Sequence, residues 1–195
     1  SHVHVRSRQA LSGAGWRLLY AQEALNGNHD KSIPGEAEKI TAELLHIFAQ
    51  AQDDNTSSAT FTTDIQCQRV SRKDGHLVLM ELTTEKAITV EEVHEAIINF
   101  NQNSSLNSAP SSPLKPIHLV DEIDTKAHLW SDGENFSNHP NPSENLKTGM
   151  AIVVSNIEVH EGNKLHFSAY SHNTIRGAAG GVVLLAELLA KQSLI

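Results

Sequence analysis

The chain has 195 residues, of which 39% are hydrophobic and 19% are charged, and its formal net charge is −8 at pH 7. This length and apolar content suffice for one hydrophobic core, so we predict a single domain over residues 1–195. The negative charge and the lack of any basic run argue against a nucleic-acid partner, and no apolar stretch reaches the roughly 20 residues that span a bilayer.

The single cysteine and the first residues indicate the cellular compartment. One thiol, that of Cys67, cannot form an internal disulfide, which is usual in a reducing compartment. Residues 1–5 alternate polar and apolar side chains like a strand and lack the basic and apolar segments of a secretory leader. We expect a soluble, cytoplasmic protein whose natural chain begins upstream of Ser1, with a plastid location left open.

The first half of the chain combines strand-like and helix-like patterns. We predict strands at residues 2–8, 60–70 and 76–83, and helices at residues 16–25 and 34–50. Alternation of polar and apolar residues indicates the strands, and apolar residues every three or four positions indicate the helices. Ser32 and Pro34 are typical start signals for the second helix. The short polar segment 71–75 favours a hairpin between the last two strands.

The second half begins with a helix and ends with a helix. Thr89 and Glu92 fit a capping box, so we predict a helix from there to about Asn101. Further strands are predicted at residues 117–120, 150–160 and 164–170, the last two joined as a hairpin. Segments 101–116 and 131–147 are rich in Asn, Ser and Pro and are interpreted as flexible loops. The apolar segment 175–194 predicts a helix buried against the sheet.

These elements together predict an α+β fold. The strands in hairpins form a mixed, largely antiparallel sheet, and each helix has one apolar stripe to cover it. We therefore expect helices packed mainly on one face of the sheet, which leaves the other face free to pair with a second copy of the chain.

Two charged pairs are candidates for binding a small anionic substrate. Glu36 and Lys39 lie three residues apart at a helix start, which places an anion and a cation on one face. A hairpin would bring Arg69, which suits carboxylates, beside His76, which suits proton transfer. From spacing alone, the commoner explanation of both pairs is a set of solvated side chains without a ligand.

Three other features have simpler structural explanations. The Gly-rich turn at residues 12–15 fails as a dinucleotide fingerprint, because Leu18 stands where a third small residue belongs. Cys67 lies on an alternating strand, where a lone cysteine is usually a small buried apolar side chain, so we do not assign it as a nucleophile. The 12 histidines lack a converging thiol or carboxylate cluster, so we predict no metal site.

The same residues fall in four segments that resemble, in the same order, motifs of the aspartate-semialdehyde dehydrogenases over almost the whole chain. The first segment, residues 9–15 (Gln-Ala-Leu-Ser-Gly-Ala-Gly), is similar to the family's turn between catalytic and cofactor-binding residues. The resemblance implies that Gln9 orients the acyl-enzyme. It also implies that Ser12 and Gly13 contact the cofactor.

The second and third segments carry the substrate residues of the family. Residues 33–40 (Ile-Pro-Gly-Glu-Ala-Glu-Lys-Ile) imply that Glu36 and Lys39 hold the substrate amino group and its phosphate or carboxylate. Gln-Cys-Gln-Arg-Val, followed by Gly-His, resembles the family's Arg and His seven residues apart. The resemblance therefore implies that Arg69 binds the substrate carboxylate and that His76 is the acid/base.

The fourth segment, residues 172–180 (His-Asn-Thr-Ile-Arg-Gly-Ala-Ala-Gly), is similar to the family's closing motif. It implies that Asn173 lies near the nicotinamide of NADP. The fold implied is the C-terminal, catalytic and dimerisation domain of the glyceraldehyde-3-phosphate-dehydrogenase type, with a homodimer formed through the sheet.

The resemblance also implies a reaction, the NADPH-dependent reduction of aspartyl phosphate with release of phosphate, in which a cysteine thiolate attacks the acyl phosphate. The family's nucleophile and nucleotide-binding half precede the first motif, so we expect both upstream of this chain and expect the chain alone to be inactive. Segments 16–19, 44–45 and 131–147 depart from the family pattern. A related acyl-phosphate or acyl-CoA reductase and a non-catalytic dimerisation or regulatory module therefore stay open.

Overall fold

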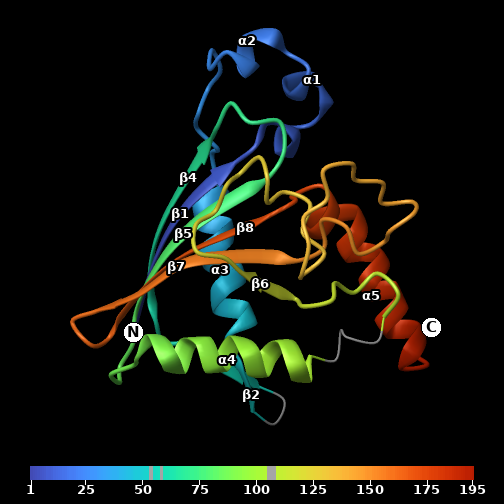
Figure 1. The fold of residues 1–195 in the computed structure, drawn as a ribbon. Coiled ribbons are helices and arrows are strands. Elements are labelled where there is room, and N and C mark those ends of the chain that lie inside the picture. The colour runs from blue at the N-terminus through green and yellow to red at the C-terminus, as the bar shows by residue number, and fades with distance from the viewer. Residues whose placement is uncertain (53–54, 58, 105–108) are drawn as a thin grey trace.

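A six-stranded sheet is the centre of the fold (Figure 1). The structure, a computed structural model, describes residues 1–52, 55–57, 59–104 and 109–195. In spatial order the strands are β4 (Thr62–Arg69), β1 (His2–Gln9), β5 (His76–Thr83), β8 (Lys164–Ser171), β7 (Ile152–His160) and β6 (Ile117–Leu119). The β1–β4 and β6–β7 pairs are parallel, and the other three are antiparallel. The predicted mixed, largely antiparallel sheet is confirmed.

The order of the first strands corrects one prediction. β4 and β5 do not form a hairpin, because β1 lies between them, parallel to β4 and antiparallel to β5. The connection between β4 and β5 therefore passes over the end of β1. Sequence separation favoured the hairpin, but β1 supplies both neighbours with a full ladder of backbone hydrogen bonds. The hairpin of β7 and β8 is confirmed.

Two longer helices accompany the sheet, and three short helical segments follow β1. α3 (Glu36–Ile47) begins after Gly35, and α4 (Val90–Asn103) begins after Thr89. The predicted capping box is present, since the Glu92 N–H donates to Thr89 Oγ1 and Thr89 N–H donates to Glu92 Oε2, at 3.1 and 2.8 Å. The short segments are a 3-10 turn (Leu11–Ala14), α1 (Trp16–Leu19) and α2 (Gln22–Leu25). The helix predicted at 16–25 is thus two helices, because Ala21 between them is extended.

A separate two-stranded sheet follows α3. It consists of β2 (Gln50–Gln52) and β3 (Asn55–Ser57), paired antiparallel. Residues 105–108 of the loop predicted at 101–116 lie outside the described residues, and α4 covers the first three residues of that segment.

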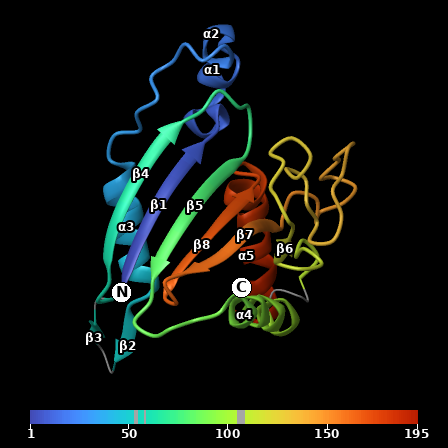
Figure 2. The ribbon, with the colours of Figure 1, turned by 60° about the vertical axis from the view of Figure 1, so that its left-hand side comes forward.

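α3 and α4 pack on the same face of the large sheet. Thr41 of α3 is hydrogen-bonded to Thr63 of β4 at 3.1 Å, and the apolar stripe of α4 lies beside Leu165 of β8. Val3 and Leu82 connect Thr63 to Leu165 as successive cross-strand partners, so all four side chains share one face. Figure 2 shows α3 behind the strands. The predicted α+β arrangement, with helices mainly on one face, is confirmed.

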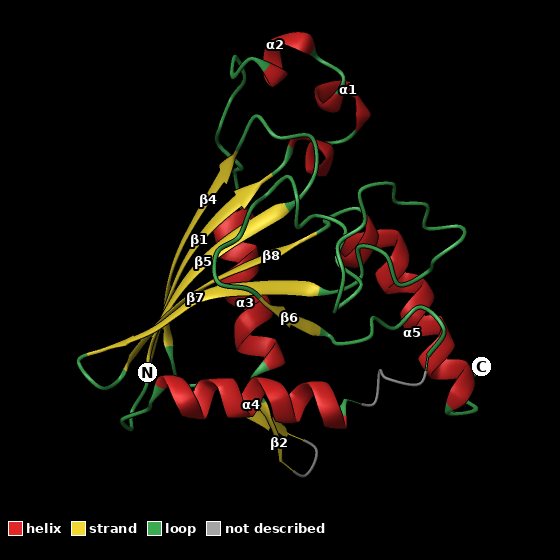
Figure 3. Ribbon diagram, in the orientation of Figure 1, coloured by secondary structure: helices red, strands yellow, loops and turns green. Residues whose placement is uncertain are grey.

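The last helical segment differs from its prediction. A π-helical turn (Ile175–Ala179) leads into α5 (Gly180–Lys191), which lies beside the end of the sheet instead of against its face (Figure 3). Only Leu184 is fully buried, at 3% exposure, and it packs with Ala109 and Met150. Val182 is 67% exposed, because one stripe of this mostly apolar helix suffices for this contact. No helix of the described ranges is long and apolar enough to cross a membrane.

Gly75, the residue before β5, makes a close contact that fixes the beginning of this strand. Its φ is +97°, and a Cβ added there would overlap the hydroxyl end of the Tyr170 ring. Tyr170 is 1% exposed, and its hydroxyl donates to the Thr125 carbonyl at 2.8 Å, so the ring is held on both sides. The backbone at Gly75 therefore has no room for a side chain.

We predict that Gly75→Ala lowers the free energy of unfolding by about 3 kcal/mol, through a strained φ and an overlap with Tyr170. The measurement is urea unfolding of the chain. Gly162→Ala is the matched control, because Gly162 also has a positive φ, +75°, but no atom within 4 Å of the added Cβ. It should cost about 1 kcal/mol. Equal losses in the two variants would show that the Tyr170 contact is unimportant.

Candidate active site

The predicted site residues meet at the edge of the sheet where β1 and β4 end and β5 begins. Gln9, the last residue of β1, is the cross-strand partner of both Arg69 and His76. The chain then turns over this edge, where Leu11 and Ser12 donate their N–H groups to the carbonyls of Arg72 and Lys73, at 2.8 and 3.0 Å. Arg69 and His76 are thus brought together around Gln9, not by a hairpin.

Gln9 connects a carboxylate to a guanidinium. Its Nε2 donates to Glu36 Oε1 at 2.8 Å, and its Oε1 accepts from Arg69 Nη1 at 3.4 Å. The same Nη1 donates to the Ala10 carbonyl at 2.9 Å. Arg69 is only 8% exposed. Burial lowers the pKa of Arg69, and the negative charge of Glu36 acts in the opposite direction. Glu36 is thus the anion that faces this buried cation.

Gly13 covers this group of side chains from the turn. A Cβ at this position would lie 2.9 Å from Arg69 Nη1 and 3.7 Å from Gln9 Oε1. An Ala at this position would make the end of the Arg69 side chain shift. Gly13 therefore allows the Arg69–Gln9 contact to form as it is.

His76 faces the same interior from the start of β5. Its Nε2 is 2.7 Å from the hydroxyl oxygen of Ser7, which is 2% exposed. Burial lowers the pKa of His76, Glu36 opposes this effect, and the positive charges of Arg72 and Arg69 reinforce it. The imidazole is therefore neutral at neutral pH, which is the state that can accept a proton.

Asn173 ties the turn to the strand that carries His76. Its Nδ2 donates to Ser12 Oγ at 2.8 Å, and its Oδ1 accepts from the Gly75 N–H at 2.7 Å. Asn173 follows β8 in the chain, so these two bonds join three separate segments at the site. Ser12, Gly13 and Asn173, predicted to contact a cofactor, are thus neighbours.

Lys39 and Cys67 stand apart from this network. Lys39 lies on α3 with Glu36, but its side chain is 60% exposed and its Nζ is 3.7 Å from Glu43 Oε1. Burial raises the pKa of the Cys67 thiol, and a hydrogen bond from Ser7 only partly offsets this. The thiol is therefore protonated at neutral pH and is a poor nucleophile. Within the described residues, no group of three or more His, Cys, Asp or Glu side chains is arranged to hold a metal ion.

Sequence reasoning missed two residues near the site, Ser7 and Arg72. Arg72 Nη2 donates to the carbonyls of Arg8 and Gly75, at 3.4 and 3.3 Å, and its guanidinium lies 5.4 Å from the centre of the Tyr170 ring. Ser7 shares the buried face of β1 with Val5, and this alternation was the one available signal. Nothing in the sequence indicates the contacts of Arg72.

Comparison with known proteins gives consistent relatives. The chain is 31% identical over 194 residues to aspartate-semialdehyde dehydrogenase of Methanothermobacter thermautotrophicus, covering 96% of this chain and 51% of that protein. The Archaeoglobus fulgidus enzyme is also 31% identical, over 193 residues, with 99% and 51% covered. Malonyl CoA reductase (NADP) of Metallosphaera sedula is 27% identical over 200 residues, with 100% and 52% covered. No protein-family model matches the chain.

Solved structures show the same fold. The crystal structure of aspartate semialdehyde dehydrogenase with NADP from Candida albicans matches with a TM-score of 0.70 and 24% identity, over 100% of this chain and 51% of that one. Aspartate semialdehyde dehydrogenase II of Vibrio cholerae, complexed with ASA, matches with a TM-score of 0.63 and 16% identity, over 97% and 55%. The chain thus spans about half the length of the proteins it matches.

The buried histidines predict that the protein loses stability in acid. Burial lowers the pKa of His76, His118 and His172 below the ordinary value of 6.5. The unfolded chain therefore binds more protons than the folded chain as the pH falls. The stability that these neutral histidines contribute is complete above the unfolded pKa and is lost as the pH falls through 6.5 towards the folded pKa values.

We predict that the free energy of unfolding falls between about pH 7.5 and about pH 5.5, and that it falls less in His76→Asn. Urea unfolding at the two pH values measures both slopes. An identical pH dependence in the parent and the variant would contradict the assignment of His76 as a buried neutral base.

Proposed function

Because the chain is homologous to the aspartate-semialdehyde dehydrogenases over about half of their length, we propose that it is the substrate-binding and proton-transfer part of such an enzyme. The full-length protein reduces L-4-aspartyl phosphate to L-aspartate 4-semialdehyde with NADPH and releases phosphate, in cytoplasmic lysine, methionine and threonine biosynthesis. The observation that carries this proposal is the convergence of Gln9, Glu36, Arg69 and His76 at one edge of the sheet.

The charged groups of the site match the charged groups of an aspartyl substrate. Arg69 uses Nη1 within the protein, and the planar guanidinium has further donors for the α-carboxylate. Glu36 offers a carboxylate to the α-amino group. The Gln9 side chain lies between Glu36 and Arg69 and is hydrogen-bonded to both. Lys39, exposed on the same helix, supplies the positive charge for the phosphate.

His76 carries the proton during the reaction. Its buried, neutral imidazole accepts the proton of the attacking thiol and gives it to the departing phosphate. We assign this thiol to a cysteine outside this chain, because burial raises the pKa of Cys67, which is the cross-strand partner of Ser7. Gln9, fixed between Glu36 and Arg69, offers its amide group for orienting the acyl-enzyme.

The Ser12–Gly13 turn is the part of this chain that fits NADP. Bound NADPH supplies the hydride for the reduction, and most of its binding residues lie outside the chain. Gly13 and Ala14 are exposed and small, so a flat ring can approach the turn closely. Asn173 fits a supporting role as well, because its two hydrogen bonds hold the turn in place beside His76.

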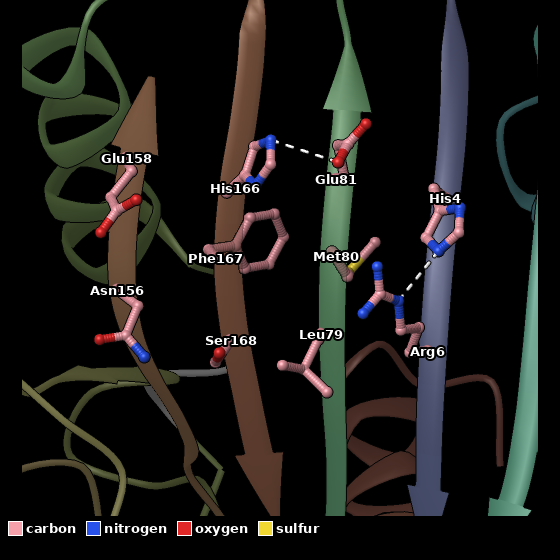
Figure 4. A pocket seen from close by; sticks show the side chains of 10 residues that line it. All are labelled: His4, Arg6, Leu79, Met80, Glu81, Asn156, Glu158, His166, Phe167 and Ser168. Carbon is pink, nitrogen blue, oxygen red and sulfur yellow. Dashed lines mark hydrogen bonds and ion pairs between the residues drawn. The ribbon is translucent and has the colours of Figure 1, made fainter. Parts of the chain in front are cut away.

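The sheet face opposite α3 and α4 is the surface we propose for a homodimer. Its strands carry His4, Arg6, Glu81, Glu158 and His166, which lie side by side in Figure 4. Glu81 is 3.3 Å from His166 Nε2. A face of alternating acidic and basic groups matches its own two-fold copy, in which each charge can meet an opposite one.

The relationship to a malonyl CoA reductase favours one alternative, reduction of an acyl-CoA thioester by the same site. Arg69 would then bind the free carboxylate of the malonyl group, and Glu36 would have no ammonium partner. A non-catalytic dimerisation or regulatory module is the second alternative. The retention of the whole network around Gln9 speaks against the loss of activity.

We predict that the full-length protein forms NADPH from aspartate semialdehyde, phosphate and NADP, and that His76→Asn lowers kcat at least about 100-fold. His94→Asn, on the exposed side of α4, is the matched control and should stay within about twofold of the parent. The same protein is assayed with malonyl-CoA and NADPH. Activity with malonyl-CoA alone would select the first alternative, and a folded protein inactive in both assays would select the second.

We predict that the protein is a dimer by light scattering and that Glu81→Arg weakens the dimer about 10-fold or more. The substitution replaces the acidic cross-strand partner of His4 by a second guanidinium close to Arg6, in a face that must meet its own copy. Glu91→Arg, the same charge reversal on α4, should leave the dimer intact. A monomeric parent, or equal effects of both reversals, would refute the sheet-mediated dimer.

A further inference from the structure

We propose that Ser7 is the positioning residue for His76 and that proton transfer takes place at Nδ1 of the imidazole; this rests on the proposed function of the site. Ser7 does not belong to any of the four motifs that drew attention to the site. Its hydroxyl oxygen lies 2.7 Å from His76 Nε2, a short distance for such a bond. The contact joins residues 69 positions apart in the chain.

The backbone holds the Ser7 hydroxyl in a fixed place. Ser7 lies on β1, an inner strand of the sheet, and is paired with Cys67 of β4 on one side and Val78 of β5 on the other. Its side chain is 2% exposed, so no solvent competes for the hydroxyl. His76 begins β5, two residues from Val78, where a ring without a partner would be free to turn. Ser7 removes that freedom.

A hydroxyl suits both protonation states of the ring. In the neutral ring that can accept a proton at Nδ1, Nε2 carries the hydrogen and donates it to the Ser7 oxygen; in the imidazolium the added proton is on Nδ1 and the Nε2–H bond to Ser7 is unchanged. In both states the Ser7 hydroxyl donates its own hydrogen to the Cys67 sulfur. No proton leaves Ser7 or Cys67 in this change. The ring therefore keeps its orientation while His76 gains and loses a proton.

This contact assigns different tasks to the two ring nitrogens. Nε2 is occupied by Ser7, whose side chain is 2% exposed on a strand paired with β4 and β5. The exchangeable proton of the reaction then moves on and off Nδ1. The position of Nδ1 follows from the ring orientation that Ser7 sets, so loss of the hydroxyl affects the chemical step more than substrate binding.

The test compares Ser7→Ala, Ser7→Thr and Ser155→Ala in the full-length protein. Ser155 is the matched control, because it is 1% exposed in the same sheet and its hydroxyl has no partner among the described residues. We expect Ser7→Ala to lower kcat between about 10-fold and about 100-fold with KM within about twofold. Ser7→Thr, which restores the hydroxyl, should recover most of kcat, and Ser155→Ala should resemble the parent.

The outcomes separate positioning from packing. An unchanged kcat in Ser7→Ala overturns the proposal. So does a loss of kcat that Ser155→Ala shares, since that loss reflects a weakened sheet. If Ser7→Thr fails to fold because of its extra methyl group, the split between kcat and KM in Ser7→Ala decides the question alone.

A second measurement does not depend on activity. Histidine ring nitrogens of the full-length protein are labelled with 15N, and His76 is assigned by its loss in His76→Asn. We expect Ser7→Ala to shift the Nε2 resonance of His76 and to leave that of His172 unchanged. An unchanged Nε2 resonance overturns the inference. A shifted resonance in a protein inactive with both acyl substrates would retain the Ser7 contact and reject the proposed function.

Discussion

The placement of β1 between β4 and β5 is the constraint on which the site depends. In this register Gln9 is the partner of Arg69 on one side and of His76 on the other, so three side chains of different chemistry meet at one edge. A shift of β1 by one residue would turn Gln9 to the opposite face and move Ser7 away from His76. The alternation of buried Val5 and Ser7 with exposed Arg6 and Arg8 opposes such a shift.

Burial, opposed by one acidic side chain, sets the charge state of the site. Arg69 and His76 are both removed from water, and Glu36 is the anion that raises the pKa of each. Arg69 stays charged, because guanidinium loses its proton only far above neutral pH. A histidine has an ordinary pKa near neutrality, and burial lowers the pKa of His76, so the same environment leaves its imidazole neutral. One environment thus provides the cation and the neutral base that the proposed function uses.

Two surfaces of the chain suit further contacts. The face carrying His4, Arg6 and Glu81 is polar and charged, whereas α5 exposes apolar side chains such as Val182 and Leu185. A charged face suits a symmetric copy, in which opposite charges meet. An exposed apolar stripe suits the rest of a longer enzyme, in agreement with relatives twice as long. Both assignments belong to the proposed full-length protein.

The sequence by itself determined the class of fold and most of its elements. Alternation identified β1, β4, β5, β7 and β8, and the capping box identified α4, because these signals are local. The motifs also named Gln9, Glu36, Arg69 and His76 as one site. Spacing alone did not do so, since isolated pairs of charges are common on protein surfaces.

The tertiary structure decided what local signals cannot carry. The insertion of β1 between β4 and β5 replaced the predicted hairpin, because strand order depends on hydrogen bonds between distant residues. α5 exposes several apolar side chains although its composition predicted burial, because burial depends on what lies next to a helix. The contact of Ser7 with His76 arises in the same way. This contact forms only when β1 and β5 are paired in one sheet, because the two residues lie 69 positions apart in the chain.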